Sequence, residues 1–231
     1  MSQTNVLITG GSRGIGRAIA LRFAREGCKV AIASRSSNEL DAVVAEIDAA
    51  GGDGLAAQLD LKDIGSVEAA VWRAVDHFEG RMDVLVNNAG LFDVKPIEET
   101  SNDMFKTILE VNLTGAFLVT KEAMESLAES ERGHIFNIAS IAAKQGFAGS
   151  TAYCASKYGL RGFGDALREE VRDKKIRVST VYPQATDTTI FDNVAGDWDR
   201  SKMNKPEDIA NAIYDAYAAD QDADDIDIAL P

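Results

Sequence analysis

Short apolar runs alternate along this chain with longer stretches in which apolar residues recur every three or four positions. The short runs are typical of buried strands, and they span residues 6–9, 30–33, 55–59, 84–86, 135–138, 176–182 and 226–230. The longer stretches predict helices over residues 15–26, 40–50, 67–78, 104–127, 152–172 and 206–218. Because strands and helices alternate, we expect one α/β domain over residues 1–231, with a doubly wound, seven-stranded parallel sheet.

Length and composition fit such a domain and narrow its location. At 231 residues, 45% hydrophobic and 26% charged, the chain has room for a substantial core. It contains no apolar run of about 18 residues and no signal-peptide pattern at its start, so we expect no membrane-spanning helix. The two cysteines, Cys28 and Cys154, are interpreted as buried thiols in a reducing compartment, and a reactive Cys154 is the less favoured alternative. These features predict a cytoplasmic protein.

The net charge of −13 at pH 7 restricts the possible partners. Nucleic acid and acidic membrane surfaces are polyanions, so binding to either is not expected. Acidic residues are dense after Lys205, where no Lys or Arg follows, and we interpret this segment as a solvated acidic face. An anionic ligand must therefore be met by local positive charge or by a helix N-terminus.

The residues after the first predicted strand have the composition of a phosphate-binding turn. Residues 9–16 read Thr-Gly-Gly-Ser-Arg-Gly-Ile-Gly, which differs in spacing from the Gly-x-Gly-x-x-Gly dinucleotide fingerprint but shares its strand–loop–helix context. A glycine-rich turn lets the backbone approach a pyrophosphate, whose charge the helix N-terminus favours. The candidate contacts from this turn are Gly10, Ser12, Arg13, Gly14, Ile15 and Gly16.

The end of the second predicted strand indicates which dinucleotide would bind. An acidic residue often follows this strand and holds a ribose 2′-hydroxyl, but this chain has Ser34 and Arg35 there. With Arg13 from the first loop, two arginines and no carboxylate suit a 2′-phosphate, which guanidinium groups bind in a bidentate manner. We therefore predict NADP(H) as the cofactor. The alternative is that both arginines are ordinary surface residues.

The later strand ends add small and polar candidates that would let an adenosine and its ribose pack against the backbone. They are Asp60 and Leu61 after the third strand, and Asn88, Ala89 and Gly90 after the fourth. Asn112 lies inside the predicted helix 104–127, where asparagine is a poor choice unless its side chain has a specific partner.

The stretch 140–157 suggests proton transfer. Tyr153 and Lys157 are four residues apart, on one face of a helix whose N-cap is Ser150 or Thr151. A free phenol has a pKa of about 10, and a cation one turn away would lower it. Ser140, at the end of a predicted strand, would hold the oxygen of a carbonyl or an alcohol. Taken alone, this spacing is a weak signal.

Taken in order, these motifs resemble the short-chain dehydrogenase/reductase family, and the resemblance spans essentially the whole chain. It rests on residues 9–16, Asp60, residues 87–90, Asn112, Ser140, Tyr153 and Lys157. The resemblance implies a Rossmann-type fold and a small-molecule carbonyl or alcohol substrate, and no metal ligands are expected. It implies that Tyr153 is the general acid, that Lys157 lowers its pKa and holds the nicotinamide ribose, that Ser140 orients the substrate, and that Asn112 supports a water chain.

Two segments depart from the family pattern or lack a clear periodicity. In residues 183–188, Pro183 and Thr188 fit the cofactor-binding loop of the family, while Gln184 replaces a glycine and Thr186 a valine. We expect Pro183, Thr186 and Thr188 to contact the cofactor, and Gln184 either to contact it or to narrow the substrate pocket. Residues 189–205 are expected to form a substrate-covering lid or, equally, a surface loop with a few core anchors.

The leading hypothesis is an NADP(H)-dependent alcohol dehydrogenase or ketone reductase. One alternative is 3-oxoacyl-[acyl-carrier-protein] reductase, but an acidic carrier would need a basic docking patch, for which Arg132, Lys174 and Lys175 are the plausible cluster. An alternative of another class is a regulatory protein that senses NADP(H) without turnover, and its signature would be a broken catalytic set.

A homo-oligomer, dimer or tetramer, is also predicted. The helices around Asn112 and Tyr153 carry more apolar residues than one sheet face needs, namely Phe117, Leu118, Leu160, Phe163 and Leu167. The resembling enzymes pair these helices across a two-fold axis, as closed symmetry requires.

Overall fold

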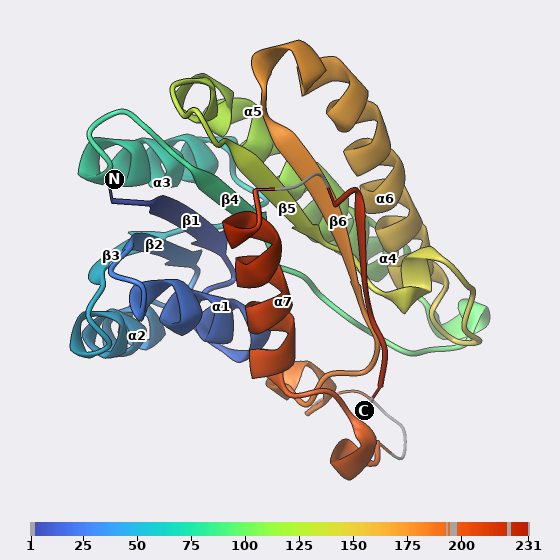
Figure 1. Ribbon diagram of the computed structural model, residues 1–231. Coiled ribbons are helices and arrows are strands. Elements are labelled where there is room, and N and C mark those ends of the chain that lie inside the picture. Colours follow the sequence, from blue (N-terminus) through green and yellow to red (C-terminus); the bar gives the residue numbers. More distant parts are fainter. Residues whose placement is uncertain (1–2, 193, 195–197, 221–222, 231) are drawn as a thin grey trace.

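Seven parallel strands form one sheet in the order β3-β2-β1-β4-β5-β6-β7 in the part of the chain that the structure describes (Figure 1). This computed structural model describes residues 3–192, 194, 198–220 and 223–230. The strands are β1 Asn5–Thr9, β2 Lys29–Ser34, β3 Asp53–Gln58, β4 Val84–Asn87, β5 His134–Ile138, β6 Arg177–Pro183 and β7 Asp225–Ile228. The predicted doubly wound, seven-stranded parallel sheet is therefore confirmed.

Helices cover both faces of the sheet (Figure 1). They are α1 Gly14–Ala24, α2 Ser37–Ala49, α3 Ile64–His77, α4 Asn102–Leu109, α5 Gly115–Ala128, α6 Thr151–Val171 and α7 Pro206–Ala218. On one face, α1 packs between α2 and α7, and on the other face α3 packs against α5, with α6 beside them. The short helix α4 packs against α6 at the edge of the second layer.

The two core layers follow from the alternation of side chains along each strand. In β2, Val30 and Ile32 belong to the apolar cluster under α1, while Ala31 and Ala33 belong to the cluster on the opposite face. All four are essentially inaccessible to solvent. Burying a large aliphatic side chain contributes roughly 1.5–3 kcal/mol, so this continuous pattern strongly favours a sheet covered on both faces.

The predicted helix 104–127 is one helical run with a defect in the middle. Between α4 and α5, residues Glu110–Thr114 form a π-helical turn, which holds one more residue than an α-helical turn. Asn112 lies at its centre and is buried. Of the two predicted N-caps of α6, the structure has Ser150, but its side chain makes no capping hydrogen bond.

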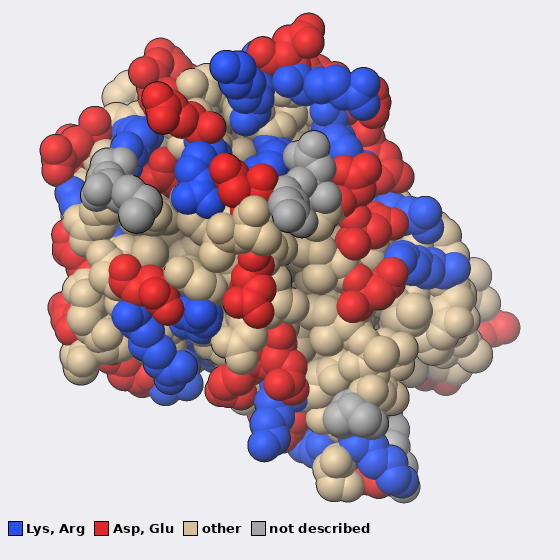
Figure 2. Space-filling view, in the orientation of Figure 1, with Lys and Arg blue, Asp and Glu red and all other residues tan. Residues whose placement is uncertain are grey.

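The acidic segment after Lys205 is paired more extensively than a purely solvated face would be. Asp220 lies 3.3 Å from Arg132, Asp224 lies 3.2 Å from Arg168, and Asp227 lies 2.7 Å from Lys144. Figure 2 shows acidic and basic side chains interspersed over one face of the molecule in the same way. Exposed pairs of this kind contribute about 0–1 kcal/mol each, so they affect local charge more than stability.

The strand order reverses between β1 and β4, and this determines where a ligand can enter. Thr9 of β1 pairs with Ala33 of β2, and Asn87 of β4 pairs with Asn137 of β5, so the carboxyl ends of these strands lie along one edge of the sheet. Beyond β1 the chain leaves toward one face, and beyond β4 toward the other, which leaves a crevice between the two connections.

Candidate active site

A cavity of about 980 Å³ opens at this edge and contains nearly all of the residues that the sequence singled out. The predicted site residues that line it are Gly10, Ser12, Arg13, Gly14, Ile15, Ser34, Arg35, Asp60, Leu61, Asn88, Ala89, Gly90, Ser140, Tyr153, Lys157, Pro183, Thr186 and Thr188. Gln184 lines it too, whereas Gly16 and Asn112 lie outside its wall.

The glycine turn after β1 is held by backbone contacts that exclude side chains. Gly14 has φ +54°, in the left-handed region, and a Cβ there would lie 3.2 Å from Thr188. A Cβ on Gly16 would lie 2.3 Å from the carbonyl oxygen of Gly10, so this glycine lets α1 approach the turn. The Asn88 side chain donates to the carbonyls of Thr9 (2.9 Å) and Gly10 (3.1 Å). Gly16 and Asn88 thus shape the turn from behind.

At the β2 end of the cavity, the side chains of three predicted residues have no partner among the residues that the structure describes. The Ser34 hydroxyl is buried without a hydrogen bond, although the residue lines the cavity. The guanidinium groups of Arg13 and Arg35 are exposed and make no ion pair within the described chain. Unpartnered donors gathered at one end of a cavity suit an anionic ligand group.

Sequence reasoning missed one carboxylate at this end. Glu39, in the first turn of α2, lines the cavity, and its Oε2 accepts a hydrogen bond from the Ser12 hydroxyl at 2.9 Å. The helix was expected to begin at residue 40, whereas it begins at Ser37. The first turn of α2 is polar and shows no apolar periodicity. The only indication in the sequence that Glu39 belongs to the site was therefore its closeness in sequence to Ser34 and Arg35.

Asp60 is committed partly to its own turn. Its carboxylate accepts a hydrogen bond from the Lys62 amide at 3.0 Å, and its backbone amide donates to the Ser66 hydroxyl at 2.9 Å. This turn leads from β3 into α3, where Asp63 caps the helix through the amides of Gly65 and Ser66. Asp60 nevertheless lines the cavity.

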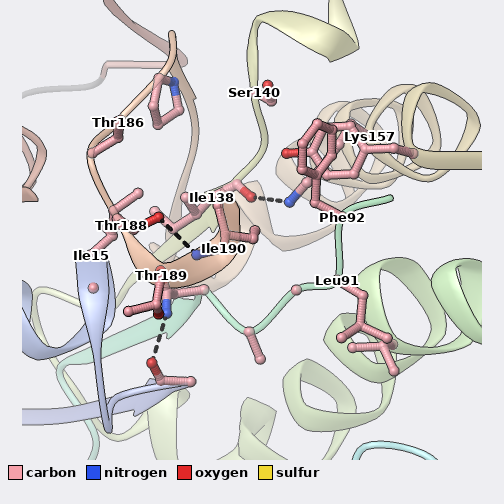
Figure 3. A pocket seen from close by; sticks show the side chains of 18 of the residues that line it. Ile15, Leu91, Phe92, Ile138, Ser140, Lys157, Thr186, Thr188, Thr189 and Ile190 are labelled. Carbon is pink, nitrogen blue, oxygen red and sulfur yellow. Dashed lines mark hydrogen bonds between the residues drawn. The ribbon is translucent and has the colours of Figure 1, made fainter. Parts of the chain in front are cut away.

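Tyr153 and Lys157 lie at the other end of the cavity, on the first turns of α6. The Lys157 ammonium lies 5.6 Å from the centre of the Tyr153 ring and donates to the carbonyl oxygen of Ile138 at 2.7 Å (Figure 3). Burial lowers the pKa of Lys157 to about 8, because the interior disfavours the charged form.

The electrostatics of Tyr153 differ from the sequence prediction. Burial raises the pKa of Tyr153 to about 12, and the hydrogen bond with Ser140 opposes this shift only in part. In the structure described, desolvation therefore outweighs any lowering by Lys157, and the role that the resemblance assigns to Lys157 stays a prediction. At neutral pH the phenol is protonated and Lys157 is mostly charged.

Ser140 is placed by the chain reversal after β5 rather than by the strand itself. It lies two residues beyond Ile138 and caps the short 3₁₀ helix Ile141–Ala143, where its Oγ accepts a hydrogen bond from the Ala142 amide at 3.1 Å. The same hydroxyl meets the Tyr153 side chain. The two hydroxyls therefore face one point in the cavity.

Asn112 acts from outside the cavity. Its Oδ1 accepts from the Leu91 amide at 2.7 Å, and its Nδ2 donates to the Leu91 carbonyl at 2.9 Å and to the Ser156 hydroxyl at 3.0 Å. Both amide hydrogens are used, so this side chain ties the segment after β4 to α6. The prediction that Asn112 has a specific partner is correct, and the partners are protein groups.

An aromatic cluster covers Tyr153, and one of its members was missed. The ring of Phe92 meets that of Tyr153 edge to face at 4.7 Å between centroids, and it also lies 5.6 Å from Phe191 and 6.0 Å from Trp198. Phe191 and Trp198 belong to the segment 189–205, of which residues 193 and 195–197 lie outside the described chain. No periodicity marks Phe92, which follows β4 in an irregular segment.

Comparison with known proteins identifies the family. A family model described as short chain dehydrogenase matches residues 4–198. The chain belongs to this family. It is therefore an oxidoreductase, and a 2,5-dichloro-2,5-cyclohexadiene-1,4-diol dehydrogenase from Sphingobium indicum is 39% identical over 89% of this chain and 85% of that protein. A 3-oxoacyl-[acyl-carrier-protein] reductase from Synechocystis is 34% identical over 90% and 86% of the two chains.

Solved structures of short-chain dehydrogenases share the whole fold. An alcohol dehydrogenase from the archaeon Thermococcus sibiricus, complexed with 5-hydroxy-NADP, has a TM-score of 0.91 and 29% identity, covering 98% of this chain and 96% of that one. A 3-ketoacyl-(acyl-carrier-protein) reductase from Brucella melitensis, complexed with NADH, has a TM-score of 0.89, 30% identity and coverage of 97% and 96%. The family thus uses nicotinamide dinucleotides of both kinds.

Within the described residues, the structure has no helix that is both long and apolar enough to cross a membrane.

Proposed function

We propose that this short-chain dehydrogenase reduces a carbonyl group with NADPH to a secondary alcohol, or catalyses the reverse reaction, with Tyr153 as the general acid or base. One observation carries the proposal. A single cavity has unpartnered Ser34, Arg13 and Arg35 at one end and a protonated phenol beside Ser140 and Lys157 at the other. Binding groups and proton-transfer groups therefore face the same space.

The residues of the cavity fit an NADP(H) molecule. The orphaned Ser34 hydroxyl with Arg13 and Arg35 would hold the 2′-phosphate, and the turn from Gly10 to Gly14, at the N-terminus of α1, would hold the pyrophosphate. Lys157 would hold the nicotinamide ribose, and Asp60, Ala89 and Gly90 the adenosine side. Bound there, the nicotinamide supplies or accepts a hydride at the carbonyl carbon.

The chain's own groups account for the proton. The Tyr153 phenol, whose pKa burial raises to about 12, is protonated at neutral pH, so it can donate its proton to the oxygen of a carbonyl as negative charge develops there. The Ser140 hydroxyl would donate a second hydrogen bond to that oxygen. The charged Lys157, one turn away, would stabilise the phenolate that remains. Asn112 holds Leu91 and Ser156 in place and is a positioning residue here.

The two alternative functions gain no support from specific contacts. Docking of an acidic carrier protein would need the cluster of Arg132, Lys174 and Lys175, but Arg132 is engaged with Asp220 and with the carbonyl of Tyr217. A sensor without turnover would show a damaged proton-transfer set, whereas Ser140, Tyr153 and Lys157 are intact and close together.

We also propose a homo-oligomer, on a smaller set of residues than the sequence indicated. Leu160 and Leu167 are buried in the core, so they are not available for an interface, and this part of the prediction was wrong. Phe117 on α5 is 47% exposed and Tyr158 on α6 is 45% exposed. Phe117 also meets Phe163 edge to face at 6.4 Å, which forms an apolar surface across both helices.

The test is a panel of carbonyl compounds with NADPH and with NADH, followed by absorbance of the reduced nicotinamide, in the wild type and in Tyr153→Phe. We expect turnover to fall on the order of 10²- to 10⁴-fold while NADPH binding survives, because only the hydroxyl is lost. Tyr158→Phe on the same helix is the matched control, because Tyr158 does not line the cavity and the substitution keeps its ring at the proposed interface. A near-normal kcat in Tyr153→Phe would contradict the proposal.

A further inference from the structure

Among the described residues, the charged side chains that line the cavity are confined to one end, with Lys157 as the exception. Arg13, Arg35 and Glu39 follow β1 and β2, and Asp60 and Lys62 follow β3. In the sheet order these strands all lie on one side of β4. Apart from Lys157 on α6, the segments that follow β4, β5 and β6 contribute no charged side chain to the lining, as far as the structure describes them.

Cations close to this uncharged end are already neutralised. Lys95 lies 3.6 Å from Asp93, and Lys144 lies 2.7 Å from Asp227. Arg200 pairs with both Asp187 and Asp192. Lys157 is the one cation of the described lining at this end, and the proposed function commits it to the nicotinamide ribose. A carboxylate or phosphate on the substrate would therefore be desolvated here without a further cation to meet it, which is costly.

The cavity lining includes aromatic rings from three separate segments, and the rings of two of these segments form a cluster with Tyr153. Phe92 follows β4, and Phe191 and Trp198 come from the segment after β6, with ring centroids 4.8 Å apart. Phe92 contacts both of these rings and Tyr153. Phe147, from the loop before α6, lines the same cavity and is 43% exposed. Such a wall offers ring faces and edges at the spacing at which aromatic groups pack favourably.

We propose that the substrate is an uncharged, ring-bearing ketone, or the corresponding secondary alcohol, seated against Phe92, Phe191 and Trp198. This inference rests on the proposed function and adds the class of substrate. In reduction, the carbonyl carbon gains a hydride as NADPH is oxidised to NADP⁺, and the carbonyl oxygen gains the proton of Tyr153. Gln145 and Gln184 are among the polar but neutral groups on the lining that can meet ring substituents.

Matched substrates test the charge requirement. Methyl 4-acetylbenzoate and 4-acetylbenzoate have the same ring and ketone but differ in one negative charge. We expect kcat/KM with NADPH to be about a hundredfold higher for the ester, because the acid places an unpaired charge in the apolar end. Equal or higher kcat/KM for the acid overturns the proposal.

A second pair tests the ring. Acetophenone is compared with an open-chain methyl ketone of the same carbon number. Ring packing against Phe92 and Trp198 predicts that kcat/KM is about tenfold higher for acetophenone than for the open-chain ketone. This is the factor expected from the free energy that aromatic packing adds to the burial of apolar area. An open-chain ketone reduced as well as acetophenone contradicts the aromatic assignment.

Substitutions of Trp198 test whether the aromatic cluster causes the preference for an aromatic ketone. Trp198→Leu should lower kcat/KM for acetophenone about tenfold through KM, with the Kd for NADPH unchanged, and Trp198→Phe should restore most of it. Trp72 on α3 is 72% exposed, so Trp72→Leu is the control and should have no effect. If Trp198→Leu leaves KM unchanged, the proposal is wrong.

Binding can be followed without turnover, which separates the two proposals. The chain has two tryptophans, so Trp72→Phe leaves Trp198 as the sole indole, and its fluorescence should be quenched by acetophenone but not by 4-acetylbenzoate. Absence of quenching by acetophenone overturns the substrate class. If carbonyl compounds are reduced with no preference for an uncharged or an aromatic ketone, the substrate class is wrong but the proposed function stands. If no carbonyl compound is reduced at all, both the substrate class and the proposed function are wrong.

Discussion

Lys157 donates a hydrogen bond from its ammonium group to the carbonyl oxygen of Ile138, at 2.7 Å. This contact fixes the cation at the carboxyl end of β5, one helical turn from the Tyr153 phenol. The carbonyl satisfies one of its three donors, and the others are free to meet a ligand that enters the cavity. The charge of this buried group, whose pKa burial lowers to about 8, therefore controls the electrostatics of the site.

We expect cofactor binding to weaken as pH rises through about 8. Lys157 is charged below that pH and neutral above it, and the loss of a charge-assisted contact should raise the Kd for NADPH roughly tenfold. Fluorescence titration across this range measures the effect. Lys157→Met should bind weakly with a flat pH profile, and a wild-type Kd that does not change with pH would show that this ionisation is unrelated to binding.

Removal of either unpartnered arginine should select against NADPH. A charge-assisted hydrogen bond contributes roughly 1.5–3 kcal/mol, so Arg13→Ala or Arg35→Ala should raise KM for NADPH about ten- to a hundredfold and leave KM for NADH almost unchanged. Arg25→Ala, an exposed arginine at the far end of α1, is the control. Equal losses for both cofactors would mean that the arginines serve the adenine or the fold.

Glu39 should act in the opposite direction. Its carboxylate lies at the same end of the cavity and engages the Ser12 hydroxyl, which a 2′-phosphate would otherwise use. Glu39→Gln removes the repulsion and should raise the preference for NADPH over NADH about tenfold. Asp41→Asn, exposed on the same helix, should leave the ratio unchanged. If Glu39→Gln leaves the preference for NADPH over NADH unchanged, the carboxylate lies too far from the 2′-phosphate to affect its binding.

Acid should destabilise the sheet through His134. Burial, with Arg177 nearby, holds the pKa of His134 well below its usual 6.5, so the folded state keeps the ring neutral while the unfolded chain protonates it. The contribution of this neutral ring to the free energy of unfolding is fully present above about pH 6.5. It is lost as pH falls toward the folded-state pKa, by at most about 1.4 kcal/mol per pH unit.

Urea unfolding at several pH values measures this slope. His77→Gln removes the other histidine of the chain and should leave the slope unchanged. The native ring of His134 can be followed separately by NMR. If it titrates near its ordinary pKa while the protein stays folded, the burial argument fails.

The exposed surface of α5 and α6 predicts an assembly that one substitution should break. Light scattering at micromolar concentration should give a particle at least twice the 24.8 kDa of one chain. Phe117→Asp should reduce it to a single chain, because a charge would be buried at the interface. Trp72→Asp, at an exposed position on α3, is the control. A wild-type particle of 24.8 kDa would contradict the prediction.

The sheet and the location of the cavity could be predicted because both follow from local periodicity. Runs such as residues 30–33 carry the signature of strands buried on both faces, and the rule that ligands bind at carboxyl ends then places Ser34 and Ser140 at one edge. Residues whose place in the site follows directly from the topology could therefore be predicted.

The remaining features depend on tertiary contacts that no periodicity records. The contact between the Phe92 and Tyr153 rings joins segments that are far apart in sequence. The spacing of Tyr153 and Lys157 shows that they are neighbours, but not that burial outweighs their mutual charge effect. The π-helical turn adds one residue to a long helical run, which hardly changes the apolar pattern.

That turn, Glu110–Thr114, lets one continuous run of helix serve two different packing partners. One residue corresponds to about 100° of rotation, so α4 presents one set of side chains to α6 while α5 presents another to α3. The same rotation directs Asn112 toward Leu91 and Ser156. The length of this run is therefore constrained, because a gain or loss of one residue would turn either the core face or the site face away from its partner.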